Sequence, residues 1–220
     1  MKEKNPADYL THPRAHFFTM CDKIALPYSN KNIDRFVNNS IWQGIDSSNG
    51  LAKLNIFSLP YPYNIDFIRK FYNRPMKVSK QIIISNNNSA GRGFEETHLF
   101  ATEMGNKYSF NVCCPSVNYN EWLNIVSESL CCISLDPSHE IGQIPIECAI
   151  LGTLFIGSNM DAAEELWPSC CGIKQDHLES RIQKLNNIHN YMPVLFNAYH
   201  YVTERHSFDS FRKKFEEIIK

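Results

Sequence analysis

From residue 81 onward, short apolar runs alternate with segments whose apolar residues recur at helical spacing. The first run, at 81–85, is rich in isoleucine and leads into Ser-Asn-Asn-Asn, which predicts a strand followed by a turn. Similar runs and the periodic segments between them predict further strands and helices. The expected strands lie at 108–114, 131–137 and 153–158, and the expected helices at 93–105, 118–130 and 144–152, with a short helix or turn at 161–167.

Two of these helices show which residues should face a core. In the first, Gly105 is expected to end the helix. The apolar residues that lie roughly on one side are Phe94, Leu99, Phe100 and Met104 in the first helix, and Trp122, Leu123, Val126 and Leu130 in the second.

Strands that alternate with helices indicate βαβ units and therefore a parallel sheet. The strand runs are nearly all apolar, as expected for strands that helices cover on both faces. We therefore predict an α/β fold, a Rossmann-like parallel sheet flanked by helices, over 81–220. Its last part, from residue 175, turns helical again, and Ser207 with Asp209 is suited to cap the final helix.

Residues 1–80 follow a different pattern. They offer a helix end and a short strand within 16–30, a helical stretch, a strand within 51–58, and a proline-rich turn before a second helical stretch. The basic and polar segment 74–80 is expected to be a linker. We do not expect 1–80 to form an independent domain.

Composition narrows the class of protein. The chain has 220 residues, 43% hydrophobic and 20% charged, which is typical of one globular domain with some extra sequence. A formal net charge of −1 gives no broad attraction for nucleic acid or anionic membranes. No apolar run reaches the roughly 18 residues of a membrane span, and the N-terminal stretch lacks the apolar core of a secretory signal. We expect a cytoplasmic protein.

The eight cysteines agree with that expectation. Six of them form adjacent pairs, and neighbours in a strand point to opposite faces, so they do not readily bridge to each other. No Cys-x-x-Cys occurs, and no cysteine and histidine set has the spacing of a zinc site. We expect free thiols and no metal.

The strongest chemical signal lies at 133–157, where an expected strand leads through Asp-Pro-Ser into a helix. Glu140 and Glu147 flank Gly142 across this turn. The free N–H groups at a helix start favour an anion such as phosphate, and a glycine lets the anion approach the backbone. Carboxylates accept hydrogen bonds from hydroxyl groups. Phosphate and hydroxyl recognition together describe a site for a nucleotide sugar.

This region resembles the C-terminal, donor-binding half of GT-B glycosyltransferases, especially the large retaining family that uses nucleotide sugars. The matching residues are Pro137, Ser138, Glu140, Gly142, Glu147, Ala149, Gly152 and Thr153. Weaker similarities extend over most of 20–220, so that 1–80 resembles the end of an N-terminal GT-B domain and its linker.

The resemblance implies a transfer of a sugar from a nucleotide diphosphate donor to an acceptor hydroxyl, with retention and without a metal or other cofactor. Glu140 would orient the transferred sugar as the catalytic residue, and Glu147 would hold the ribose. Arg92 matches an arginine that grips the diphosphate. The implied donor-binding set is Arg92, Ser138, Ile141, Gly142, Gln143 and Glu147.

Three departures from the family pattern keep an alternative open. Six residues separate the two glutamates instead of the usual seven, and no lysine follows Arg92. Only 1–80 corresponds to the acceptor-binding domain, so the acceptor is unknown: either that domain is drastically reduced, or a partner chain supplies it, or the sequence is a fragment. The alternative is a non-catalytic relative that binds a nucleotide sugar or serves as a partner subunit.

The two glutamates and Arg92 can also be explained without any ligand, by purely structural roles. Glu140 and Glu147 would then be a solvated loop acid and an acid that complements a helix dipole. Arg92 would be a surface residue of a loop. The surroundings of these side chains in the fold distinguish the structural explanation from the functional one.

Overall fold

In a computed structural model of the chain, the described residues are 16–19, 55–72, 80–84, 93–135, 143–158, 166–167, 171–172, 179–180, 182, 190 and 192–219. The chain forms two compact units, one of residues 1–61 with 212–220 and one of residues 62–211. Each unit is described by itself. In the first, β1 (His16–Thr19) pairs in parallel with β2 (Asn55–Ser58). β2 lies where the sequence predicts a strand, whereas β1 occupies the start of 16–30, where we expected a helix end before the strand.

The second unit is built on a parallel sheet with the strand order β4-β3-β5-β6-β7. Every neighbouring pair is parallel. The predicted α/β fold is therefore confirmed, and β7 is an addition that the apolar pattern does not indicate. The strands are β3 (Gln81–Ile84), β4 (Asn111–Cys113), β5 (Cys131–Ser134), β6 (Leu154–Ser158) and β7 (Cys171–Gly172).

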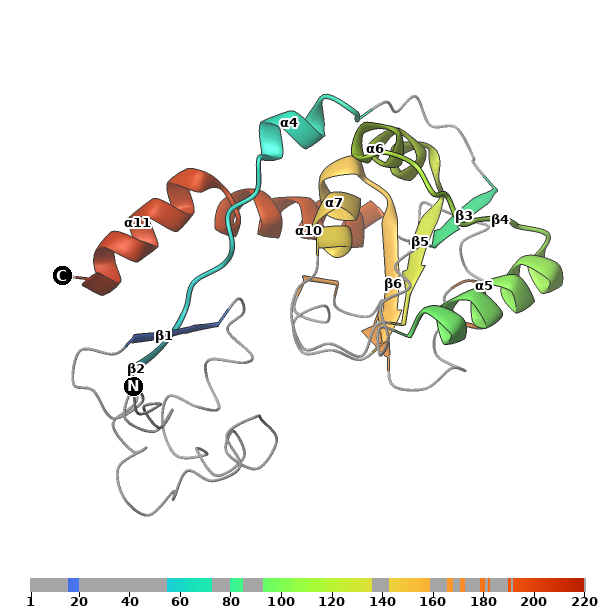
Figure 1. Ribbon diagram of the computed structural model, residues 1–220, viewed down its shortest axis with the longest axis horizontal. Coiled ribbons are helices and arrows are strands. Elements are labelled where there is room, and N and C mark those ends of the chain that lie inside the picture. Colours follow the sequence, from blue (N-terminus) through green and yellow to red (C-terminus); the bar gives the residue numbers. More distant parts are fainter. Residues whose placement is uncertain are drawn as a thin grey trace, which may run out of the picture. The chain divides into compact units, whose positions relative to one another are not determined.

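The structure also describes the following helices, of which the three between β3 and β6 connect the strands (Figure 1). They are α4 (Ile65–Arg69), α5 (Phe94–Tyr108), α6 (Tyr119–Glu128), α7 (Gln143–Leu151), α10 (Met192–Arg205) and α11 (Phe208–Ile219). The chain moves from β3 outward to β4 and then returns past β3 to β5. Because parallel crossovers are right-handed, this reversal places α5 on one face of the sheet and α6 and α7 on the other.

Burial on both faces explains the continuous apolar strands. Ile82, Ile83 and Ile84 of β3 are all fully buried, and so are Cys131 and Cys132 of β5. Alternate residues of a strand point to opposite faces, so both faces must be covered. These two cysteines, with Cys113, Cys114 and Cys148, are free thiols, which confirms the expectation for these five.

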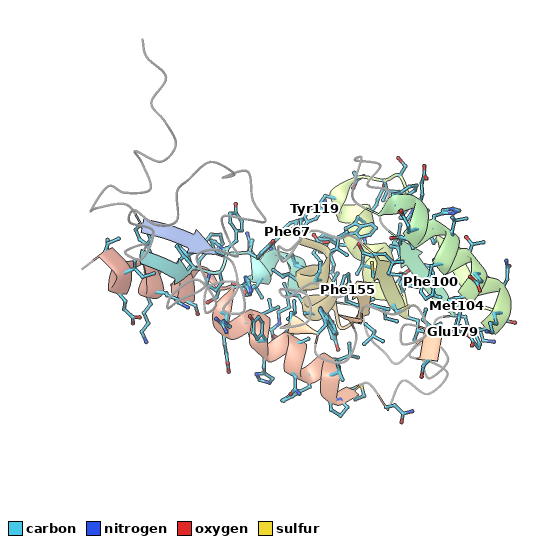
Figure 2. The ribbon with its side chains drawn as sticks, turned by 90° about the horizontal axis from the view of Figure 1, so that it is seen from below. Phe67, Phe100, Met104, Tyr119, Phe155 and Glu179 are labelled. Atoms are coloured by element: carbon cyan, nitrogen blue, oxygen red, sulfur yellow. The ribbon has the colours of Figure 1, made fainter. Side chains whose placement is uncertain are left out.

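The core-facing stripe of α5 differs from the expected one. Phe100 and Met104, labelled in Figure 2, are buried as predicted. Leu99, in contrast, is 70% exposed. Thr97 and Ala101 complete the buried stripe instead. We predicted a buried Leu99 because it is apolar. The residues that are buried instead follow the i, i+3 and i+4 spacing, which places residues on one face of a helix.

We expected Gly105 to end α5, but it lies inside the helix. The helix continues to Tyr108 and ends at Ser109, which adopts a left-handed conformation with φ of 59°. A Cβ at position 105 would lie 2.6 Å from Cγ2 of Val112 and 3.1 Å from the carbonyl oxygen of Phe110. The glycine therefore allows α5 to approach the following strand closely, rather than breaking the helix.

Helix α7 is buried along almost its whole length. All residues from Pro145 to Leu151 are buried, and the helix packs against α4, α6 and α10. Its C-terminus closes at Gly152, whose φ is 67°, with hydrogen bonds from Gly152 N to Ala149 O and from Thr153 N to Cys148 O. This Schellman pattern needs a left-handed residue, which glycine supplies without strain. The predicted cap of α11 is also present, because Ser207 Oγ accepts from Ser210 N at 3.1 Å.

Replacing Gly105 with alanine should destabilise the protein although alanine favours helix. The new methyl group would force Val112 or the helix to move, and overpacking of this kind costs about 1–3 kcal/mol. Chemical denaturation of Gly105→Ala against Asn106→Ala, an exposed position on the same helix, measures the effect. A Gly105→Ala variant as stable as the control would show that β4 does not constrain α5 there.

Candidate functional site

The two central strands of the sheet end side by side at its carboxyl edge. β3 and β5 are neighbours, with Ile84 paired to Ile133. The chain leaves β3 toward one face and β5 toward the other, so this is the point where the direction of strand order reverses. Open α/β sheets bind ligands in the crevice outside such a switch point. The segments that carry Arg92 and Ser138 to Gly142 follow these two strands in the sequence.

Thr97 connects the described residues that border these two segments. Its hydroxyl donates to Gly93 O at 2.6 Å and accepts from Leu135 N at 2.8 Å. Gly93 directly follows Arg92, and Leu135 lies just before Asp136. A single hydroxyl therefore joins the start of α5 to the end of β5. The sequence reading assigned no role to Thr97, and nothing in its neighbourhood along the chain indicates the contact.

Helices α5, α6 and α7 begin at this edge, and α5 and α6 differ in how their first residues are capped. α6 is closed by a capping box, in which Asn118 Oδ1 accepts from Glu121 N at 3.1 Å and Glu121 Oε2 accepts from Asn118 N at 3.4 Å. α5 starts at Gly93, which makes no side-chain cap hydrogen bond. Because glycine has no side chain with which to cap α5, the positive dipole end of this helix favours an anion at this edge.

Glu147 is the middle residue of α7, with 1% of its surface exposed. Its carboxylate accepts hydrogen bonds from Trp122 Nε1 at 2.7 Å and from Gln143 Nε2 at 2.5 Å. The Tyr119 hydroxyl forms a further hydrogen bond with it. These donors satisfy a buried charge, which without partners would be costly. Gln143 is exposed and lies at the start of α7, so a hydroxyl group of a ligand can take the place of its amide.

Burial raises the pKa of the Glu147 carboxyl above its ordinary value, although the hydrogen bonds from Trp122, Tyr119 and Gln143 act in the opposite direction. Burial and the neighbouring Glu147 charge also raise the pKa of Tyr119, so its hydroxyl keeps its proton and donates. The arrangement is a carboxylate surrounded by donors from two helices, beside the switch point of the sheet.

Phe67 of α4 stacks on Tyr119, with ring centroids 6.3 Å apart and an interplanar angle of 14° (Figure 2). The same residue of α6 therefore contacts Glu147 with its hydroxyl and α4 with its ring. The sequence reading placed Trp122 on an apolar helix face and did not single out Tyr119. A buried glutamate requires donors, but the sequence does not say which helix provides them.

The structure describes two of the predicted site residues, Gln143 and Glu147, and brings them into one hydrogen-bonded group. The remaining candidates, Arg92, Ser138, Glu140, Ile141 and Gly142, lie outside the described residues. Among the described residues, no three His, Cys, Asp or Glu side chains are grouped so that they could hold a metal ion.

The chain is similar to known proteins in its fold, although comparisons of its sequence find no match. No family model matches the chain, and no curated protein matches it either. Solved structures do match. A trehalose-6-phosphate synthase studied with bisubstrate glycomimetics superposes with a TM-score of 0.67 over 91% of this chain at 8% identity. TarM of S. aureus, solved with UDP, gives 0.66 over 92% at 11% identity, and the GtfA/B complex gives 0.59 over 92% at 8% identity.

The chain has the fold of the GT-B glycosyltransferases. It spans 59% of the matched trehalose-6-phosphate synthase chain, 43% of the TarM chain and 44% of the GtfA/B chain. The predicted GT-B likeness is confirmed at the level of fold. In the part of the chain that the structure describes, no helix is both long enough and apolar enough to cross a membrane.

The hydrogen bond between Trp122 and Glu147 should appear as a coupling energy. Trp122→Phe removes the donor and should lower the free energy of unfolding by about 1–3 kcal/mol because the carboxylate stays buried. In a Glu147→Met background the same change should cost much less. A double-mutant cycle by urea denaturation measures the difference, and effects that add within about 0.5 kcal/mol would contradict the contact.

The raised pKa of Glu147 predicts a pH dependence of stability. The folded state holds the proton more tightly than the unfolded state, whose ordinary value is 4.5, so this contribution is fully present below 4.5 and is lost as pH rises through the folded value. The stability of the wild type relative to Glu147→Met should therefore fall as pH rises from 4. A relative stability that increases with pH would show that the three donors outweigh burial.

Proposed function

We propose that this chain is the donor-binding half of a glycosyltransferase, which holds a nucleotide diphosphate sugar at the carboxyl edge of the sheet and transfers the sugar with retention. The observation that supports the proposal is the GT-B fold together with its switch point between β3 and β5, the strands that α5 and α7 follow in the chain. The trehalose-6-phosphate synthase that it resembles works with retention, and TarM was solved with UDP.

The diphosphate would lie between the segments that follow β3 and β5. Arg92 would pair with its negative charge, and the uncapped start of α5 would add open amides. Ser138, Ile141, Gly142 and Gln143 would contribute backbone and side-chain donors at the start of α7. The chemistry needs mainly stabilisation of charge on the leaving diphosphate, which fixed donors provide.

The two glutamates would read the hydroxyl groups of the donor. Glu140 would orient the transferred sugar as the catalytic residue, and Glu147 would accept from the ribose. A ribose hydroxyl would take the place of the Gln143 amide, while Trp122 and Tyr119 continue to hold the carboxylate in position. The Tyr119 ring, 40% exposed, lies at the same site and offers a surface for the nucleotide.

A non-catalytic role is the second candidate, as a degenerate binding protein or a partner subunit. Glu95 and Glu96 lie in the first turn of α5, where the family carries a lysine, and their charges oppose that of a diphosphate. The chain is also shorter than its structural neighbours, and one of them is a complex of two proteins. A partner chain would then supply the acceptor-binding domain.

Nucleotide binding tests the proposal. Thermal unfolding should be measured with UDP, GDP and ADP, because a ligand at about 100 times its dissociation constant stabilises by about 2.7 kcal/mol. Arg92→Gln should weaken the binding of the preferred nucleotide by about tenfold, the loss expected for one charge-assisted contact. Lys80→Gln is the matched control, since Lys80 precedes β3 at the opposite edge of the sheet.

The outcomes separate the two candidates. Binding together with slow release of free sugar from the matching nucleotide sugar supports the transferase, and binding without release favours the non-catalytic role. Failure of all three nucleotides to bind, or equal losses in Arg92→Gln and Lys80→Gln, would overturn donor binding at this edge.

A further inference from the structure

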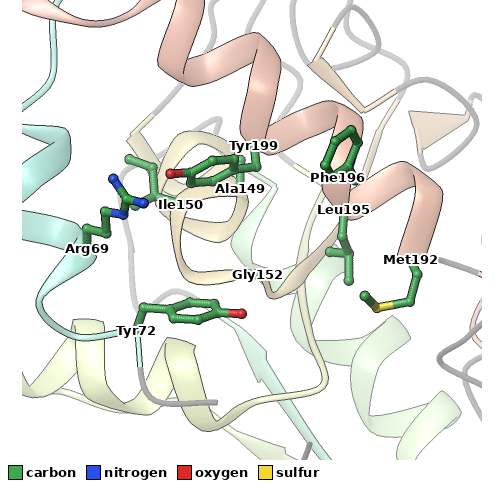
Figure 3. Close-up of a pocket in the computed structure, with 9 residues that line it drawn as sticks. All are labelled: Arg69, Tyr72, Ala149, Ile150, Gly152, Met192, Leu195, Phe196 and Tyr199. Atoms are coloured by element: carbon green, nitrogen blue, oxygen red, sulfur yellow. The ribbon is translucent and has the colours of Figure 1, made fainter. Parts of the chain in front are cut away.

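A cavity of about 340 Å³ lies at the C-terminal end of α7, away from the candidate donor site (Figure 3). Three elements of the second unit enclose it. The end of α4 contributes Arg69 and, just beyond the helix, Tyr72. The end of α7 contributes its last turn and Gly152, and α10 forms the remaining wall. The lining residues are Arg69, Tyr72, Ala149, Ile150, Gly152, Met192, Leu195, Phe196 and Tyr199.

The cavity has an apolar body and one charged end. Met192 and Leu195 lie at one end, and Arg69 lies at the other beside Tyr199 (Figure 3). The Arg69 guanidinium carbon is 5.7 Å from the centroid of the Tyr199 ring. Within the described residues Arg69 has no ion-pair partner, and it is the one charged side chain in the lining. Its charge is therefore available to an anionic group that enters the cavity.

The rim adds a second indication of a ligand. Tyr72, Met192 and Phe196 are 50%, 46% and 62% exposed, although aromatic and thioether side chains gain from burial. They surround one opening rather than being scattered over the surface. A cavity of a few hundred Å³ with apolar walls and one placed polar group is typical of a small-molecule site.

This cavity is separate from the proposed donor site. The nine residues of α7 span about 13 Å, with Gln143 at the carboxyl edge of the sheet and Leu151 at the amino edge. Glu147 and its donors do not line the cavity. Binding at one site can therefore be measured without the other, and the two proposals fail independently.

We propose that this cavity binds a small amphipathic anion, a molecule with an aliphatic or aromatic body and one carboxylate or phosphate group. The body would lie against Ile150, Leu195 and Met192. The anionic group would pair with Arg69, which is held over the Tyr199 ring. A ligand of this class would bury the exposed rim and neutralise the available charge in the same step.

Methionine-methyl NMR with octanoate as the probe tests this proposal. The Met192 methyl signal, identified by its loss in Met192→Leu, should shift and saturate with octanoate. Neutral 1-octanol should bind about tenfold more weakly because it lacks the charge that pairs with Arg69. Octyl phosphate in place of octanoate shows which anionic group is preferred.

Matched variants identify the cation. Arg69→Gln should remove the preference of octanoate over 1-octanol, and Arg69→Lys should retain most of it. Lys70→Gln, an exposed neighbour outside the lining, should leave both affinities unchanged. The proposal is overturned if the Met192 signal does not respond to millimolar octanoate, or if Arg69→Gln and Lys70→Gln behave alike.

Discussion

The hydrogen bonding of one buried carboxylate constrains much of this fold. Helix α7 is buried almost throughout, so any polar side chain on it needs partners from the surrounding elements. Glu147 obtains them from Trp122 and Tyr119 on α6 and from Gln143 one turn before it. These contacts fix α6 against α7 at the carboxyl edge of the sheet. Tyr119 extends the same arrangement to α4 by stacking on Phe67.

This constraint is compatible with the second role that we propose for Glu147. Its interactions with Trp122 and Tyr119 stabilise the packing of two helices, and its contact with exposed Gln143 can be exchanged for one with a ligand. A carboxylate that is already oriented before a ligand arrives loses little freedom on binding. The opposite end of the same helix closes at Gly152 and lines a separate apolar cavity. Helix α7 thus connects two candidate sites that differ in chemistry.

The sequence predicted the central elements well because their signals are local. Apolar runs located β3, β4, β5 and β6, and helical periodicity located the helices between them. The errors occurred where a residue's role depends on distant parts of the chain. Gly105 was expected to stop a helix, but it is needed for close approach to Val112. The two-residue strand β7 forms by pairing with β6 and has no apolar pattern of its own.

The same limit applies to the candidate site. The motif around Glu147 could be identified from its spacing and its resemblance to GT-B sequences. Its partners could not, because Trp122 lies 25 residues away and fits an ordinary apolar helix face. Thr97 is a stronger case, since its contact with Leu135 spans 38 residues and joins the ends of two different βα units. Such contacts follow from the strand order, which the sequence did not specify.

The central claim is that a nucleotide binds beside the Trp122–Glu147 hydrogen bond. The indole N–H signal of Trp122 in a ¹⁵N NMR spectrum, identified by its loss in Trp122→Phe, reports on that bond directly. The account predicts a saturable shift of this signal with at least one of UDP, GDP and ADP. An indole signal that stays unchanged with all three at millimolar concentration would contradict it.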